Sequence, residues 1–306
     1  MDYSKKIDAE TWDFINKTGE YYPPETISYT VEQQREIYDR MCRAFFQGYP
    51  PTVTASDHMI DDVPTRHYTS GHANATVMYF HGGGFVVGGL ESHDDVCAEI
   101  CHRTGLDVVS VGYRMAPEHV HPAMYDDCLA ATRHILATTT KPVLLCGDSA
   151  GGNLSATVAH TLRNEECIIG QVLIYPGLGG DIDAGSFIEH ANAPLLTRDE
   201  IVFYEGIRYK DGVKPENDPT AIPLQDTDFT NLPPTVIISA ECDPITDGCK
   251  LYREALQNAG TNVVWFNEEG LVHGYLRART TVLRAAESFD RIITALCALL
   301  RKEWPY

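Results

Sequence analysis

No long uninterrupted hydrophobic run occurs in this chain of 306 residues. A membrane-spanning helix needs roughly 18 or more consecutive apolar residues, and no segment of the chain approaches that length. The opening residues, MDYSKKIDAETWDF, also lack the apolar stretch and the small-residue cleavage site of a signal peptide. We therefore expect a cytoplasmic protein without a membrane partner.

Basic residues are scarce as well. The chain has 24 Lys and Arg against 43 Asp and Glu, which gives a formal net charge of −19. A surface of this sign repels the nucleic-acid backbone and anionic membranes, so neither is expected as a partner. No P-loop lysine motif is present, and the segment PGLGGD does not match the dinucleotide-binding pattern G-x-G-x-x-G. The sequence predicts no nucleotide cofactor and leaves homodimerisation open.

Paired cysteine motifs are also missing. The nine cysteines are odd in number and lie in apolar or helical contexts, such as Cys146 in VLLCG and Cys297 in ITALCALL. This pattern predicts reduced, buried thiols. His93, Cys97 and Cys101 recur every four residues, which would suit zinc ligands on one helix face. The same spacing also makes a core-facing stripe, and no second ligand cluster supports zinc, so we predict no metal site.

Short apolar segments alternate with amphipathic helical segments from residue 75 onward. Continuous apolar strands separated by helices predict an α/β fold with a parallel sheet covered on both faces. Before this region, the chain is expected to form two helical pieces and then a hairpin around the turn DDVP. The alternation lapses between Gly177 and Asn231, where LLTRDEIVFYEGIRYK predicts an inserted helix, and a last helix is expected from about Arg277 to Leu300. The expected strands are ATVMYF (75–80), DVVSVGY (107–113), PVLLCG (142–147), QVLIYP (171–176), TVIISA (235–240) and NVVWFN (262–267).

The segment LLCGDSAGGN ends one expected strand and opens the next expected helix. Its residues Gly147-Asp148-Ser149-Ala150-Gly151 fit the pattern G-x-S-x-G, in which a serine stands on a sharp turn between strand and helix. Glycines beside the serine let the two backbones approach closely, although a plain glycine turn is the simpler alternative. The carboxyl end of a parallel strand is where open α/β sheets bind ligands. This position favours Ser149 as a nucleophile.

A serine needs a base to remove its proton. In enzymes built on such a turn, the acid and then the histidine follow the serine in the chain. Only His160, His190 and His273 lie beyond Ser149. His160 is on the helix directly after the turn, and His190 precedes the strand-end acids, so His273 is the predicted base.

The predicted acid lies in the loop after the strand TVIISA. Glu241, Asp243 and Asp247 are the candidates. Asp243 fits best, because it directly follows the strand and Pro244 can occupy the first position of the next helix. A simple role as a helix N-cap is the alternative for this residue.

A second glycine motif, His81-Gly82-Gly83-Gly84, directly follows the strand VMYF. Three consecutive glycines cost conformational entropy, which favours a role in pointing bare backbone N–H groups at an anion. Gly83 and Gly84, together with Ala150, would form an oxyanion hole. An ordinary glycine turn remains the alternative for this motif alone.

Taken in chain order, HGGGFVVGG, YRMAPEHVHPA, GDSAGGN, LIYP, DPITD and VHGY resemble the hormone-sensitive lipase-like esterases of the α/β-hydrolase superfamily. The segments TVEQQREIYDR and AECDPITDGCKLYREAL are similar to bacterial acetyl esterases. The resemblance implies an α/β-hydrolase fold with a mostly parallel sheet of about eight strands, helices on both faces and a helical cap. The implied cap comprises 1–50 and the insertion 183–216, and the implied core comprises 51–182 and 217–306.

The resemblance also assigns roles. It implies Ser149, Asp243 and His273 as a catalytic triad, with the oxyanion donors already named. The chain departs from the family pattern at Met115 in YRMAPE and at Tyr275, where Phe is more frequent. Neither departure affects the triad.

The implied activity is hydrolysis of short-chain acyl esters, from acetyl to about hexanoyl, through an acyl-serine intermediate. A small-molecule ester is the expected substrate, without cofactor or metal. An amidase, lactonase or carbamate hydrolase would use the same residues, whereas a ligand-binding receptor would lack His273. Phe85, Phe203 and Tyr204 are candidates for lining the substrate pocket, with ordinary core or cap packing as the alternative.

Overall fold

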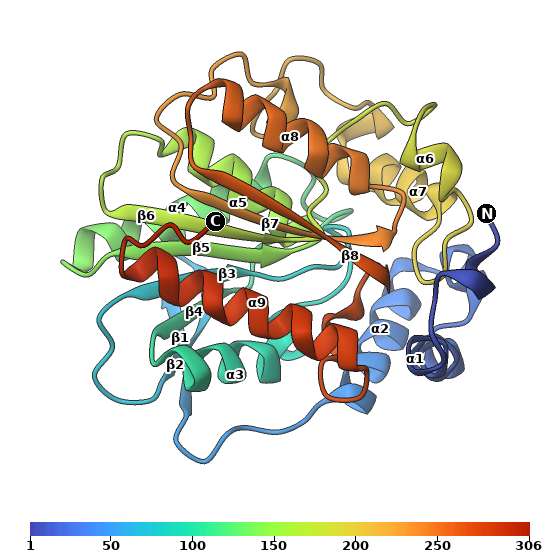
Figure 1. The fold of residues 1–306 in the computed structure, drawn as a ribbon, viewed down its shortest axis with the longest axis horizontal. Helices are drawn as coiled ribbons and strands as arrows, with labels where there is room; N and C mark the ends of the chain where they lie inside the picture. The colour runs from blue at the N-terminus through green and yellow to red at the C-terminus, as the bar shows by residue number, and fades with distance from the viewer.

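The computed structural model describes residues 1–306 and has one twisted sheet of eight strands at its centre (Figure 1). The strand order is β1-β2-β4-β3-β5-β6-β7-β8. Strands β3 to β8 run parallel, and β2 is antiparallel to both of its neighbours. The predicted mostly parallel sheet is therefore confirmed. The strands are β1 (Thr54–Ile60), β2 (Val63–Thr69), β3 (Thr76–Phe80), β4 (Asp107–Val111), β5 (Val143–Asp148), β6 (Ile168–Ile174), β7 (Thr235–Cys242) and β8 (Val263–Val272).

The pairing of β3 with β5 brings the two glycine motifs together. Every residue of these two strands is buried, which explains why their sequences are continuous apolar runs rather than alternating ones. Their register places Phe80 opposite Gly147. The HGGG segment and the serine turn therefore leave adjacent strands side by side.

The predicted hairpin around DDVP forms the edge of the sheet. Asp61 and Asp62 join β1 to β2, and both have positive φ, 45° and 67°. Two-residue hairpin loops favour this conformation because its twist matches that of the flanking strands, and Asp tolerates it.

The helices cover both faces of the sheet. Helices α3 and α9 lie on one face, and α4, α5 and α8 lie on the other (Figure 1). Helix α9 is amphipathic and buries one side, whereas α5 is buried along almost its whole length. The helices are α1 (Ala9–Tyr21), α2 (Val31–Phe45), α3 (Asp94–Thr104), α4 (Ala123–Thr138), α5 (Ala150–Thr161), α6 (Ser186–Glu189), α7 (Arg198–Arg208), α8 (Thr246–Asn258) and α9 (Leu283–Leu300).

The start of the last helix was predicted too early. Instead of continuing from Arg277, α9 begins at Leu283, and Tyr275–Ala278 forms a separate 3₁₀ turn. The chain enters this turn through Gly274 in the left-handed region, and Val282 is extended. These conformations separate the 3₁₀ turn from the helix and orient the residues after His273 independently of it.

Helices α1, α2, α6 and α7 gather at the carboxyl end of the parallel strands (Figure 1). Asp8 caps α1 by accepting a hydrogen bond from the Thr11 N–H at 2.9 Å, and Thr30 begins α2 with a capping box. The hydroxyls of Tyr22, just after α1, and Tyr204, on α7, are 2.8 Å apart. The N-terminal helices and the inserted helix therefore contact each other above the sheet. The limits of the cap, 1–50 and 183–216, stay predictions.

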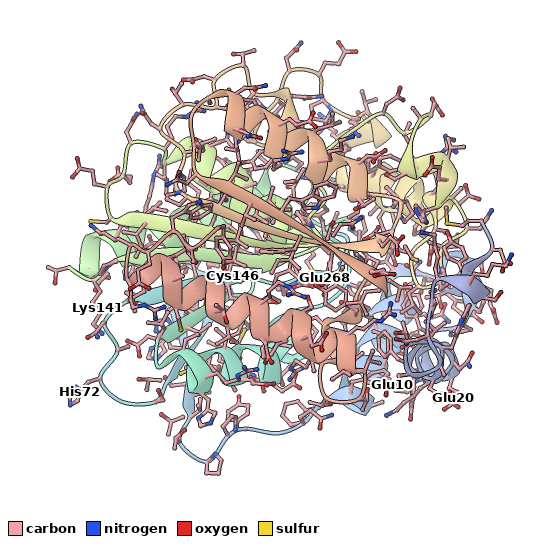
Figure 2. All side chains as sticks on the ribbon, viewed as in Figure 1. Glu10, Glu20, His72, Lys141, Cys146 and Glu268 are labelled. Carbon is pink, nitrogen blue, oxygen red and sulfur yellow. The ribbon has the colours of Figure 1, made fainter.

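One cluster of 73 buried hydrophobic residues forms the main core. Cys146 lies within the sheet, whereas Glu10, Glu20, His72 and Lys141 lie at the periphery (Figure 2). All nine cysteines are unpaired, and seven are buried. No three or more His, Cys, Asp or Glu side chains are arranged to hold a metal ion. None of the helices combines the length and hydropathy needed to cross a bilayer.

Candidate active site

Ser149 is the single residue between β5 and α5, and its backbone conformation is strained. Its φ is 54° and its ψ is −116°, a region that residues with a side chain rarely adopt. The Ser149 N–H donates to the Ile174 carbonyl at 2.9 Å, which ties the turn to β6. The turn reverses the chain sharply and directs the Ser149 hydroxyl toward the cavity above the sheet.

Two glycines allow this turn. A Cβ at Gly147 would lie 2.7 Å from the Phe80 carbonyl oxygen, and a Cβ at Gly151 would lie 2.7 Å from the His81 carbonyl oxygen and closer still to that of Phe80. The obstructing atoms are backbone and cannot rotate away. Gly147 and Gly151 are therefore required for α5 to pass close over the end of β3.

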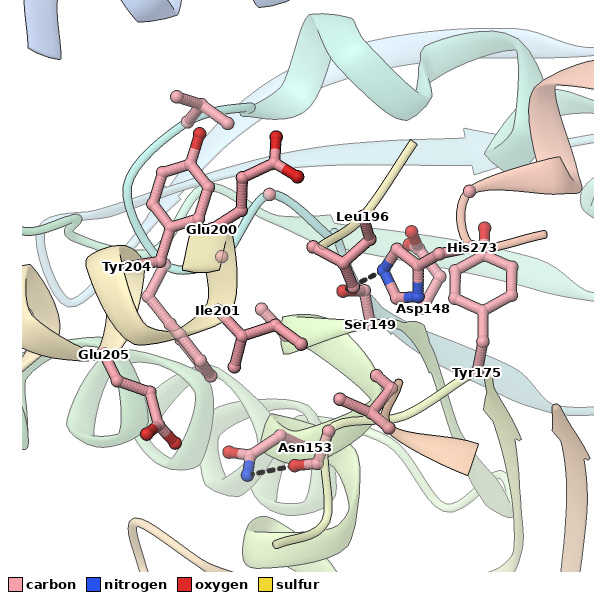
Figure 3. Close-up of a pocket in the computed structure, with 18 of the residues that line it drawn as sticks. Asp148, Ser149, Asn153, Tyr175, Leu196, Glu200, Ile201, Tyr204, Glu205 and His273 are labelled. Carbon is pink, nitrogen blue, oxygen red and sulfur yellow. Dashed lines mark hydrogen bonds between the residues drawn. The ribbon is translucent and has the colours of Figure 1, made fainter. Parts of the chain in front are cut away.

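Ser149, His273 and Asp243 form a continuous hydrogen-bonded chain. His273 Nε2 lies 2.8 Å from Ser149 Oγ (Figure 3), and on the other side of the ring His273 Nδ1 lies 2.7 Å from Asp243 Oδ2. Asp243 is fully buried, and its Oδ1 accepts the Ile245 N–H at 3.1 Å. A carboxylate only accepts hydrogen bonds, so Nδ1 carries the proton toward Asp243 and Nε2 is free to accept the Ser149 proton.

The competing histidines and acids are engaged elsewhere. His160 contacts Asp226 at 2.6 Å, and His190 lies 3.1 Å from the Tyr3 hydroxyl. Glu241 pairs with Lys6 and accepts the Gly270 N–H, and Asp247 accepts the Ser186 N–H at 2.8 Å. The structure thus brings together the three residues that the sequence analysis selected.

The HGGG loop presents unused donors to the same cavity. Gly83 and Gly84 have φ values of 130° and 59°, and neither of their N–H groups donates to an acceptor within the protein. A Cβ at Gly83 would overlap the Val87 carbonyl oxygen, so only glycine fits there. Gly83, Gly84, Ala150 and Ser149 all line one cavity. The arrangement can therefore hold an oxyanion next to the serine.

Asp148, beside the serine, holds the HGGG loop in place. Its Oδ1 accepts the Gly82 N–H at 3.0 Å and the Tyr79 hydroxyl at 2.8 Å, and its Oδ2 lies 3.1 Å from His93 Nε2. Burial acts to raise the pKa of Asp148, but His93, Arg277 and Tyr79 together hold it well below its ordinary value. Asp148 thus joins the two glycine motifs through a buried ionised carboxylate.

His81 supports the loop from the other side. Its ring stacks on Tyr113 with centroids 4.2 Å apart, and its Nδ1 lies 2.9 Å from the Gly82 carbonyl oxygen. The Tyr113 hydroxyl donates to the His81 carbonyl at 2.7 Å. Burial and the neighbouring His93 lower the pKa of His81 to about 4, so its ring is neutral near pH 7.

Replacing Asp148 with asparagine should destabilise the protein by about 1–3 kcal/mol near pH 7, because the buried network loses its negative charge and one of its two acceptor oxygens. The depressed pKa of Asp148 means that its contribution is fully present above the unfolded-state value of about 3.9 and is lost as the pH falls below it. The difference in unfolding free energy between native and Asp148→Asn proteins should therefore shrink in acid. Urea unfolding from pH 7 to pH 3 measures it, and a constant difference would contradict the expectation.

The cavity above Ser149 has a volume of about 210 Å³, and 17 of its 33 lining residues are hydrophobic. Phe85 and Tyr204 lie in its wall, and Figure 3 shows Tyr204 on α7 and Leu196 beside Ser149. The prediction for Phe203 is wrong. Adjacent positions on a helix point about 100° apart, so Phe203 packs edge-on against Tyr204 outside the cavity wall.

Sequence reasoning missed several residues of the cavity wall. Tyr175 places its ring 4.9 Å from that of His273, and Asn153, Arg208 and Arg277 also line the cavity. Tyr175 and Asn153 lie within the motifs LIYP and GDSAGGN, which were the available signals. Nothing in the local sequence distinguishes Arg208 or Arg277 from surface arginines.

Comparison with known proteins agrees with this geometry. Residues 77–277 match the family model described as alpha/beta hydrolase fold. The chain is 37% identical to the carboxylesterase NlhH of Mycobacterium tuberculosis, over 90% of this chain and 84% of that protein. It is 31% identical to an ethyl acetate hydrolase of Pseudomonas putida, over 73% of each.

A solved structure extends the comparison to three dimensions. The bacterial heroin esterase superposes with a TM-score of 0.88 at 26% sequence identity, covering 97% of this chain and 99% of that one. The resemblance to hormone-sensitive lipase-like esterases is therefore confirmed, and the chain belongs to the alpha/beta hydrolase fold family.

Proposed function

We propose that this protein is a serine carboxylesterase that hydrolyses short-chain acyl esters, from acetyl to about hexanoyl, through an acyl-serine intermediate. The observation that carries the proposal is the hydrogen-bonded chain from Asp243 through His273 to Ser149, which ends beside two unused backbone N–H groups. A nucleophile, a base and an orienting acid are thus aligned at an oxyanion site. Relatives named carboxylesterase and ethyl acetate hydrolase support the same reaction class.

Acylation begins when Ser149 Oγ attacks the ester carbonyl carbon while its proton passes to His273 Nε2. The carbonyl oxygen becomes negative, and the N–H groups of Gly83, Gly84 and Ala150 stabilise it. Asp243 stabilises the imidazolium and holds its orientation. The bond to the alcohol oxygen then breaks, and that oxygen takes the proton from Nε2.

Deacylation repeats these steps with water. His273 Nε2 removes a proton from the water as its oxygen attacks the acyl carbon, and the same N–H groups hold the oxyanion. The bond to Ser149 Oγ then breaks, and the serine recovers its proton from His273. The reaction releases the carboxylic acid and restores the free enzyme.

The size and cover of the cavity support short acyl groups. At about 210 Å³ it is smaller than the roughly 300–1,000 Å³ of typical small-molecule pockets. Side chains from α1, α2 and α7 contribute to its walls, including Phe14, Met41 and Ile201. A long acyl chain would have to displace these side chains.

Hydrolysis of 4-nitrophenyl esters with acyl chains of two to sixteen carbons tests the proposal. We expect kcat/KM to be highest between two and six carbons and to fall at least about ten-fold by ten carbons, since longer chains exceed the cavity. The Ser149→Ala protein gives the background rate. A maximum among the long chains would contradict the short-chain assignment, and faster cleavage of 4-nitroacetanilide than of 4-nitrophenyl acetate would indicate an amidase.

A cytoplasmic location is also part of the proposal. Nine unpaired cysteines, seven of them buried, suit a reducing compartment, where disulfides rarely form. Fractionation of the producing cells, with detection of the native protein in each fraction, tests this location.

A further inference from the structure

Arg208, at the end of α7, places a buried guanidinium in the wall of the catalytic cavity. The side chain is only 3% exposed, and it stacks over the Phe85 ring at 3.6 Å from the centroid. Its Nη2 lies 3.3 Å from Asn153 Oδ1 and 3.1 Å from the Ala221 carbonyl oxygen. Asn153 is in the first turn of α5, four residues after Ser149 (Figure 3), and both residues line the same cavity as Arg208.

The guanidinium of Arg208 is incompletely satisfied. Its Nε is buried without a hydrogen-bond partner, and no carboxylate forms an ion pair with it. Burial lowers the pKa of Arg208, although nearby groups, Glu205 and Asp218 among them, act to raise it. A buried cation of this kind costs free energy unless an anion accompanies it.

The carboxylates that line the same cavity all have other partners, and those of Asp148 in the HGGG loop are described above. Glu205 pairs with Lys214 at 2.8 Å. Glu200 caps the start of α7, accepting the Thr197 N–H at 2.7 Å and the Thr197 hydroxyl at 2.8 Å. Neither glutamate forms an ion pair with Arg208, although Glu205 is near enough to act on its charge.

Arg277, the other arginine in the cavity wall, also has a buried Nε without a hydrogen-bond partner, but its Nη2 has different partners from that of Arg208. Its Nη2 donates to the Tyr38 hydroxyl and to Cys42 Sγ. Burial acts to lower the pKa of Arg277, but Cys42, Tyr38 and the buried Asp148 raise it well above its ordinary value. Arg277 thus donates to a hydroxyl and a thiol that can carry negative charge, whereas Arg208 donates only to neutral carbonyl and amide oxygens.

We propose that Arg208 binds a carboxylate carried by the substrate. The preferred esters are then half-esters of dicarboxylic acids, or hydroxy acids that are acylated on the hydroxyl group and keep a free carboxylate. This inference rests on the proposed esterase function and specifies its substrate class. The carboxylate would accept hydrogen bonds from Arg208 while the ester carbonyl lies at Ser149. A planar guanidinium with free donors suits this role, because it matches the geometry of a carboxylate.

Two pairs of esters of matched shape test the proposal. Monomethyl succinate and methyl levulinate differ in whether the acyl side carries a carboxylate or a neutral methyl ketone. Acetoxyacetate and acetoxyacetone make the same comparison on the alcohol side. We expect the native protein to prefer the charged member of one pair, which also shows which side of the ester faces Arg208.

The variants separate recognition from general structural damage. Arg208→Met should lower the ratio of kcat/KM for the preferred charged ester to kcat/KM for its neutral partner about ten- to one-hundred-fold, the range for losing a hydrogen bond between charged groups. Arg208→Lys should keep part of the preference. Arg198→Met removes a cation from the same helix outside the cavity wall and should leave the preference unchanged.

Two results would overturn the proposal. One is a native protein that hydrolyses both neutral esters and shows no preference for either charged partner. The other is an Arg208→Met protein that retains the preference, or that loses charged and neutral activity equally. If the native protein hydrolyses none of these esters nor 4-nitrophenyl acetate, the esterase function itself fails, and the two failures are thus distinguishable.

Discussion

The Ser149→Ala protein is expected to hydrolyse 4-nitrophenyl acetate about 10⁵- to 10⁶-fold more slowly than the native protein. The substitution removes the only atom that can form the acyl intermediate, while the oxyanion site remains. A direct attack by water on the bound ester would then account for the residual rate. Steady-state kinetics at high enzyme concentration measure the loss, with circular dichroism confirming an unchanged fold.

A matched double variant sharpens this prediction. The rate losses caused by substituting residues of one catalytic unit do not add up, because removing a second residue costs little once the first is lost. Ser149→Ala combined with His273→Ala should therefore be no more than about three-fold slower than Ser149→Ala alone. Substantial activity in Ser149→Ala, or a large further loss in the double variant, would contradict the assignment of Ser149 and His273 to one mechanism.

The Gly151→Ala protein is expected to lose more than about 4 kcal/mol of stability, or to fail to fold. The new methyl group would overlap the Phe80 carbonyl oxygen and crowd that of His81. Those atoms belong to the backbone at the end of β3, so α5 would have to move away from the sheet. Urea unfolding, or the yield of folded protein, measures the effect.

Gly19→Ala is the matched control for this substitution. Gly19 lies in α1, and no atom within 4 Å would contact a Cβ placed there. Alanine at this position should be neutral or stabilise the protein by about 0.5–1 kcal/mol. Similar unfolding curves for Gly151→Ala and Gly19→Ala would refute the steric explanation.

The fold was predictable because its signals are local. Each strand of the parallel sheet is buried on both faces and reads as a short apolar run, for example Thr76–Phe80. The turn at Ser149 was visible because a positive φ beside a close backbone approach demands flanking glycines. The boundary of α9 was harder, because helix starts depend on loop conformations such as those of Gly274 and Val282.

The candidate site was predictable only in part. Ser149, Asp243 and His273 follow from chain order, since parallel strands bring their carboxyl ends to one edge. The cavity wall does not follow, because it depends on how α7 is rotated over the sheet. One position separates Phe203, which lies outside the wall, from Tyr204, which lines it.

The sequence by itself determined the α/β architecture, the strained serine turn and the identity of the three hydrogen-bonded residues, because each depends on local pattern and chain order. Only the tertiary structure decided that Asp148 joins the two glycine motifs and which side chains of the helices above the sheet line the cavity. Only the tertiary structure, likewise, left Arg208 buried without an anion. The reason is physical, since burial and the absence of a partner depend on contacts between segments far apart in the chain.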